Sequence, residues 1–121
     1  MSEKIPLFVV NEYEDSANDI PKLLNVKIIP PKMNFVGAFE GKKYHQKLTI
    51  QNCGKEPVFI RICPATSYAF KIKTLVRGQR LSPGLSIVRY ISYTYMRATA
   101  VRYSTLPIHI NDYQFKYKII V

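Results

Sequence analysis

The side chains that could do metal or acid–base chemistry are few in this chain and far apart. The 121 residues contain two histidines and two cysteines, namely His45, His109, Cys53 and Cys63. A structural zinc site needs four such ligands at characteristic spacing. Here the two cysteines lie ten residues apart, with no Cys-x-x-Cys pair. We therefore predict no metal site and no bound cofactor.

Acidic residues give no catalytic pattern either. From residue 26 onward the chain has only Glu40, Glu56 and Asp112, and each lies near a predicted turn. An active site needs titratable groups that converge in one pocket. The chain also lacks a Gly-rich phosphate loop and a Gly-x-Ser-x-Gly motif. We therefore expect a protein that is not an enzyme.

Basic residues carry the stronger functional signal. Residues 26–121 hold 16 of the 18 Lys and Arg residues but only 3 of the 8 acids, so their net charge is +13. Residues 1–25 have a net charge of −3. A surplus of this size attracts acidic protein segments, nucleic acids or anionic lipid.

Five lysines are the predicted partner contacts. They are Lys42, Lys43 and Lys47 near one predicted strand, and Lys116 and Lys118 on the outward side of the last strand. A solubilising and edge-protecting role is the alternative for these residues, because lysines commonly serve it on strands.

Two arginine pairs are also basic candidates. Arg77 with Arg80, and Arg97 with Arg102, are predicted to flank turns.

The elements that must position these residues are short strands separated by turns. The predicted strands are Val26–Ile29, Met33–Val36, Tyr44–Asn52, Val58–Cys63, Phe70–Ile72, Leu85–Tyr95, Arg102–Ile110 and Tyr113–Val121. Pro, Gly and Asn residues between them are typical of turns, and a helical turn is predicted over residues 19–24. Many short strands of this kind predict an all-β sandwich.

Alternation of apolar and polar residues separates a core side from a solvent side on most of these strands. Leu85–Tyr95 breaks the pattern, because Arg89 falls on its inward side. A β-bulge that shifts the register is the preferred explanation. The alternative is a partly buried Arg89 with a partner, and an apolar outer patch formed by Val88 and Tyr90.

The first 25 residues are predicted to be an acidic extension outside the sandwich of residues 26–121. Their apolar stretch Ile5–Val10 is a candidate added edge strand. The acidic run Glu12–Ala17 is predicted to be a solvated linker. A testable variant is that this arm folds back on the basic body and masks it.

Localisation signals are missing from the sequence. No apolar run approaches the roughly 20 residues needed to cross a bilayer. The N-terminus has no basic stretch followed by an apolar one, so no secretory signal is predicted. A reducing compartment follows, in which Cys53 and Cys63 are expected as free thiols rather than as a disulfide.

Six segments of the sequence match, in the same order, the pattern of a known family of domains. They are Ile29–Gly37, Lys47–Asn52, Glu56–Ile62, Tyr68–Ile72, Leu81–Ile87 and Tyr103–Ile108. This series resembles the ASH domain, the PapD-like module of Hydin and other ciliary and centrosomal proteins, which is related to major sperm protein. The chain departs from that pattern at Tyr95-Met96-Arg97, where such domains usually have a Pro-containing turn, and at Arg89, where they have an apolar residue.

The resemblance implies an immunoglobulin-like (PapD-like) β-sandwich of about seven to eight strands. It also implies a non-catalytic protein-interaction or scaffold module of a ciliary, axonemal or centrosomal protein. Such a module would dock through a sheet edge and its basic face, with the acidic tails of tubulin as the candidate partner. The alternatives are a nucleic-acid-binding β-domain and a major-sperm-protein-like domain that binds acidic peptides.

The ends of the sequence give one further expectation. Met1 is typical of a genuine start, and the chain stops within its last predicted strand. We therefore expect it to be the N-terminal part of a longer, multi-domain protein.

Overall fold

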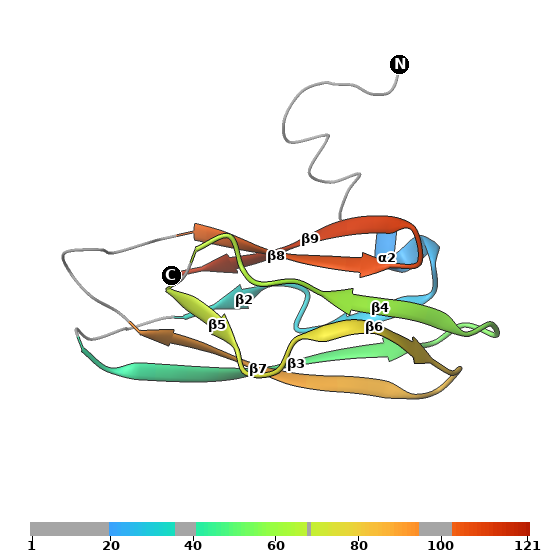
Figure 1. The fold of residues 1–121 in the computed structure, drawn as a ribbon, viewed down its shortest axis with the longest axis horizontal. Coiled ribbons are helices and arrows are strands. Elements are labelled where there is room, and N and C mark those ends of the chain that lie inside the picture. The colour runs from blue at the N-terminus through green and yellow to red at the C-terminus, as the bar shows by residue number, and fades with distance from the viewer. Residues whose placement is uncertain (1–19, 36–40, 68, 95–102) are drawn as a thin grey trace, which may run out of the picture.

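The computed structural model describes residues 20–35, 41–67, 69–94 and 103–121. These residues form two β-sheets that pack face to face (Figure 1). The elements are α2 (Ile20–Leu23), β1 (Val26–Ile29), β2 (Met33–Asn34), β3 (Lys43–Asn52), β4 (Val58–Ile62), β5 (Phe70–Ile72), β6 (Val76–Leu81), β7 (Ser86–Thr94), β8 (Tyr103–Ile110) and β9 (Tyr113–Ile120).

One sheet has four strands in the order β1-β3-β7-β5, and the other has five in the order β2-β9-β8-β4-β6. All neighbouring strands pair antiparallel except β2 and β9, which are parallel. Consecutive strands therefore cross repeatedly between the sheets, as in immunoglobulin-like sandwiches. The predicted all-β sandwich is confirmed, with nine strands in the described residues instead of seven to eight.

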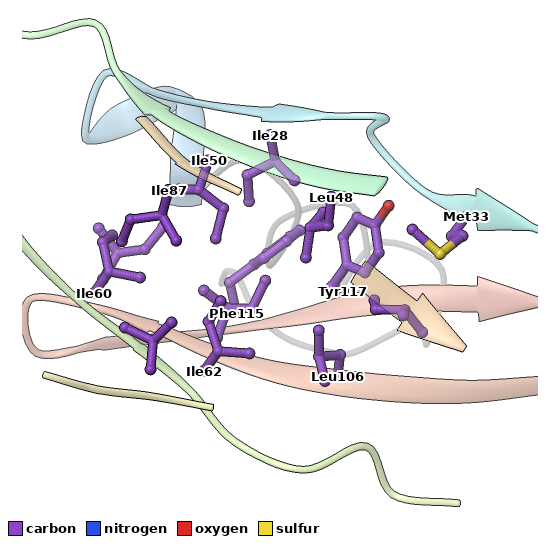
Figure 2. Close-up of a cluster of buried hydrophobic side chains, with 14 of the residues drawn as sticks. Ile28, Met33, Leu48, Ile50, Ile60, Ile62, Ile87, Leu106, Phe115 and Tyr117 are labelled. Atoms are coloured by element: carbon purple, nitrogen blue, oxygen red, sulfur yellow. The ribbon is translucent and has the colours of Figure 1, made fainter. Parts of the chain in front are cut away.

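The core lies between the inner faces of the two sheets. Every second residue of β8 is buried, and the second half of β3 buries Leu48, Ile50 and Asn52. Figure 2 shows Leu48 and Ile50 on one side of this core and Ile60, Ile62 and Leu106 on the other. Because burying one such side chain stabilises the fold by roughly 1.5–3 kcal/mol, the alternating pattern fixes which face of each strand points inward.

Most predicted strands agree with the structure, but one strand was missed. Val26–Ile29 and Phe70–Ile72 match β1 and β5, and the predicted helical turn contains α2. β6 was predicted as a turn around Gly78. The strand instead continues through Gly78, whose φ of 87° accommodates a register shift against β4 between Ile60 and Arg61. Glycine adopts this left-handed conformation at little cost.

The predicted bulge at Arg89 is wrong. The register of β7 against β3 runs without a shift from Lys43 opposite Thr94 to Gln51 opposite Ser86. The alternative holds instead: Arg89 is partly buried, and its Nε donates a hydrogen bond to the Thr74 carbonyl at 2.9 Å. The physical reason is that β5 pairs with β7 only at residues 91–93, so a neighbouring loop carbonyl can accept from Arg89.

Asn52 joins the two sheets at one end of the sandwich. This side chain is fully buried at the end of β3, and its Nδ2 donates hydrogen bonds to the carbonyls of Leu81 (2.9 Å) and Glu56 (2.8 Å). Its Oδ1 accepts a hydrogen bond from the Gly54 amide at 2.9 Å. The asparagine of the segment Lys47–Asn52 therefore organises the turn that leads into β4.

Candidate functional site

The two histidines lie on different sheets of the described part of the chain. His45 is exposed on β3, whereas His109 is partly buried on β8 of the other sheet. Within the described ranges, no three His, Cys, Asp or Glu residues are grouped as a metal site would require. Cys53 and Cys63 are free thiols, the first exposed and the second partly buried.

The structure separates the five predicted lysines into two groups. Lys43 and Lys47 lie on the outward side of β3, and Lys42 immediately precedes that strand. Lys116 and Lys118 lie on the outward side of β9 in the five-stranded sheet. Because the two sheets pack through their inner faces, these outer faces point in opposite directions. No single surface presents all five lysines.

β6 adds arginines to the outer face that carries Lys116. On β4 the inward residues are buried, and Phe59 and Arg61 point outward. Arg80 is the register partner of Phe59, and Arg77 is the register partner of Arg61. Residues three apart on a regular strand face opposite sides. The register shift at Gly78 therefore turns both arginines toward the same outer face.

We call Arg61, Arg77, Arg80 and Lys116 the arginine face; all four side chains are exposed. Arg80 Nη1 donates a hydrogen bond to the Ser82 hydroxyl at 3.0 Å. The described residues include 15 Lys and Arg but only two acids, Glu56 and Asp112. This face therefore has a large excess of cationic donors, and guanidinium groups bind carboxylates in a bidentate geometry.

The sequence interpretation missed the arginine face because it missed β6. An isolated glycine inside a strand is a known sign of a bulge. Val76 and Leu81, the two apolar residues around Gly78, are both buried in the structure. A glycine between two apolar residues was therefore the sequence signal from which β6 could have been predicted.

The outer face of the four-stranded sheet is both basic and apolar. Val88 and Tyr90 are 41% and 49% exposed, and Ile29 is 43% exposed. Thr49 of β3 pairs with Ile29 on one side and Val88 on the other, which makes one row across the sheet. Together with Lys43 and Lys47, these residues form a second surface that a partner could contact.

Several sequence predictions fall outside the described residues. They are the edge strand Ile5–Val10, the acidic run Glu12–Ala17, and the residues Glu40, Arg97 and Arg102. In the part of the chain that the structure does describe, no helix has the length and apolar character needed to span a membrane.

Comparison with known proteins finds similarity in structure but no match in sequence. No protein-family model matches the chain, and no curated protein is similar to it in sequence. The solved structure of WR4, an MSP family member from C. elegans, superimposes with a TM-score of 0.62 at 7% identity, covering 80% of this chain and 97% of WR4. The chain has the fold of the ASH and MSP domains.

Two further solved structures support this assignment of the ASH/MSP fold. The ASH/PapD-like domain 7 of human CEP192 gives a TM-score of 0.54 at 14% identity, covering 80% of this chain and 84% of that domain. SSP-19, an MSP-domain protein-like family member from Caenorhabditis elegans, gives 0.57 at 13% identity, covering 78% and 99%. The predicted resemblance to ASH and MSP domains is thus confirmed at the level of the fold.

Proposed function

We propose that this ASH/MSP-like domain is a non-catalytic protein-interaction module that binds an acidic segment of a partner protein through the arginine face. The observation that carries this proposal is the concentration of Arg61, Arg77 and Arg80 on one exposed sheet face. Hydrogen bonds to charged groups are worth about 1.5–3 kcal/mol each, more than those between neutral groups. A partner with several carboxylates therefore gains from several contacts at once.

The cellular setting is part of the same proposal. The domain would belong to a ciliary, axonemal or centrosomal scaffold. In that setting, the acidic tails of tubulin would be an abundant partner. The structural similarity to an ASH domain of human CEP192 supports this setting. Lys116 would contribute as part of the arginine face, and Lys118 lies at the edge of the same outer surface. Lys42, Lys43 and Lys47 would engage a second partner from the opposite sheet.

Nucleic acid is the second candidate partner. Phe59 is 53% exposed and lies opposite Arg80 on the neighbouring strand. An aromatic ring beside cationic side chains can stack on an unpaired base while the cations hold phosphates. Competition between an oligonucleotide and an acidic peptide distinguishes the two functions. The ligand that binds the domain more tightly displaces the other.

Co-sedimentation with microtubules tests the proposed function. The 121-residue chain is spun with intact microtubules and with microtubules whose acidic tails have been removed, across a salt series. Tail-dependent binding that weakens with salt supports the proposal, because exposed charges are screened beyond about 10 Å at 0.1 M salt. Binding that is unchanged by removal of the tails and by the salt concentration contradicts the proposal.

A further inference from the structure

A second basic site, distinct from the arginine face, lies between α2, β1 and β9. It is a groove of about 790 Å³. Four lysines line it: Lys22, Lys27, Lys32 and Lys118. Its apolar lining includes the buried residues Val26, Ile28 and Phe115. Cationic groups beside an apolar floor suit an extended segment that carries both carboxylates and apolar side chains.

The groove follows a strand edge that is only partly paired. β2 pairs with β9 at Ile119 and Ile120 alone. The Ile120 carbonyl accepts a hydrogen bond from the Phe35 amide on this edge at 2.8 Å. Because backbone groups alternate between the two sides of a strand, those of Lys116 and Gln114 point to the same edge. In the described part of the chain, no strand pairs with them there.

The chain itself supplies a segment of matching chemistry. Residues 1–19 contain five acids and one lysine, which gives a net charge of −4, and the apolar stretch Ile5–Val10. They lead directly into α2, whose Pro21 and Lys22 line the groove. Nineteen extended residues span about 60 Å. The segment is therefore tethered at the groove and is long enough to lie along it.

We propose that residues 5–19 bind this groove in cis, adding a strand to the open edge of β9 and placing their carboxylates on the lysine rim. Tethering makes the contact intramolecular, so a weak site is occupied at a high effective concentration. Strand addition uses backbone hydrogen bonds for affinity and side-chain pockets for specificity. The bound segment covers the edge that would otherwise accept a foreign strand.

Paramagnetic NMR on the 121-residue chain tests this proposal. Cys53→Ser and Cys63→Ser remove the native thiols, and Ser16→Cys carries a spin label. We expect the amide signals of Lys27, Lys118 and Ile120 to lose most of their intensity, and to regain it when the label is reduced. Unchanged groove signals, or equal losses over the whole sandwich, would overturn the proposal.

A reciprocal charge swap is the matched control. Lys27→Glu with Lys32→Glu should abolish the intensity losses, and adding Glu12→Lys with Glu14→Lys to the same chain should restore them. Restored intensity losses would show that the contact depends on complementary charge. An unfolded variant could not give this result. Failure of the swap to restore the contact would count against the lysine rim.

A mixed sample tests the source of the bound segment. Isotope-labelled chains without a spin label are combined with spin-labelled chains without isotope. Losses that reappear at the groove in the mixture would show binding between copies and overturn the cis contact. The readout needs no partner protein, so it stands or falls independently of the proposed function.

Discussion

Arg61 of β4 and Arg77 of β6 are register partners, and both side chains point out from the five-stranded sheet. Like charges directly opposite each other on a sheet oppose folding. The described residues offer few acids to relieve this repulsion, since Glu56 and Asp112 both lie in turns. An acidic partner would supply the missing counter-charge, so this pair connects the fold to the proposed function.

The first prediction concerns the repulsion itself. Arg61→Glu creates an opposite-charge pair with Arg77 and should raise the free energy of unfolding by about 0.2–1 kcal/mol at low salt. The gain should shrink at high salt, because exposed charges are screened. Urea denaturation at two salt concentrations measures both effects. Lys47→Glu, whose register partner is Tyr90, is the control. A loss of stability for Arg61→Glu at low salt would contradict the assigned register.

The second prediction concerns the bulge that aligns the arginines. Gly78 has a φ of 87°, and a Cβ there would meet nothing within 4 Å. The cost of Gly78→Ala is therefore backbone strain rather than a clash, about 1–3 kcal/mol. Thermal or urea unfolding measures it, with Gln79→Ala at the exposed neighbouring position as the control. Equal stability of the two variants would show that β6 does not need the left-handed residue.

Particular elements show how far the sequence predicts this molecule. β1 and β5 were predicted within their observed bounds, because turn residues bracket short runs of alternating apolar residues. β6 was missed because four exposed residues separate its two buried ends, Val76 and Leu81, so it shows no alternation. The arginine face depends on which residues of β4 and β6 pair. The register of β4 against β6 depends on a bulge and on both strands, so it cannot be predicted from the local sequence of either strand alone.

The sequence assigned Lys47, Lys116 and Lys118 to the correct sides of their strands, but it left Lys43 outside the predicted strand and could not place the lysines on particular surfaces. The alternation placed Lys47 and Lys116 on the outward sides of their strands, as observed. Which sheet each strand joins is set by the order of strands, and this is a tertiary property. The groove likewise brings α2, β1 and β9 together from distant parts of the chain.

The third prediction concerns Asn52. Asn52→Ala removes three hydrogen bonds and leaves the carbonyls of Leu81 and Glu56 without their side-chain donor. The hydrogen bond to Leu81 is buried, whereas the other two are only partly buried. Because leaving one buried polar group unpaired costs about 1–3 kcal/mol, we expect a loss of about that size in the free energy of unfolding. The midpoint of urea denaturation reports it. Gln51→Ala, on the outward side of the same strand, should change the midpoint little; a similar loss there would remove the specific role of Asn52.

The fourth prediction concerns Tyr117 and alkaline pH. Burial raises the pKa of the Tyr117 phenol above its usual value of 10.0, and its hydroxyl donates a hydrogen bond to the Pro30 carbonyl at 2.9 Å. The folded state therefore keeps this proton at a pH where the unfolded state has lost it. The contribution to stability is complete below about pH 10 and is lost as the pH rises above it.

Urea denaturation at about pH 9 and about pH 11 isolates this effect when Tyr117→Phe is compared with the unaltered chain. The variant should be less stable at the lower pH, because it lacks the hydrogen bond to Pro30. It should also lose less stability between the two pH values. The same pH-dependent loss in both proteins would show that other groups cause it.

The central claim is that an acidic partner binds the arginine face, and a matched pair of charge reversals tests it most directly. Arg61→Glu with Lys116→Glu changes this face, and Lys43→Glu with Lys47→Glu changes the opposite sheet. All four positions are exposed, and both double variants have the same net charge. We predict that the first pair abolishes tail-dependent binding to microtubules and that the second pair leaves it largely intact. Retained binding by the first pair, or loss by the second alone, would contradict the account.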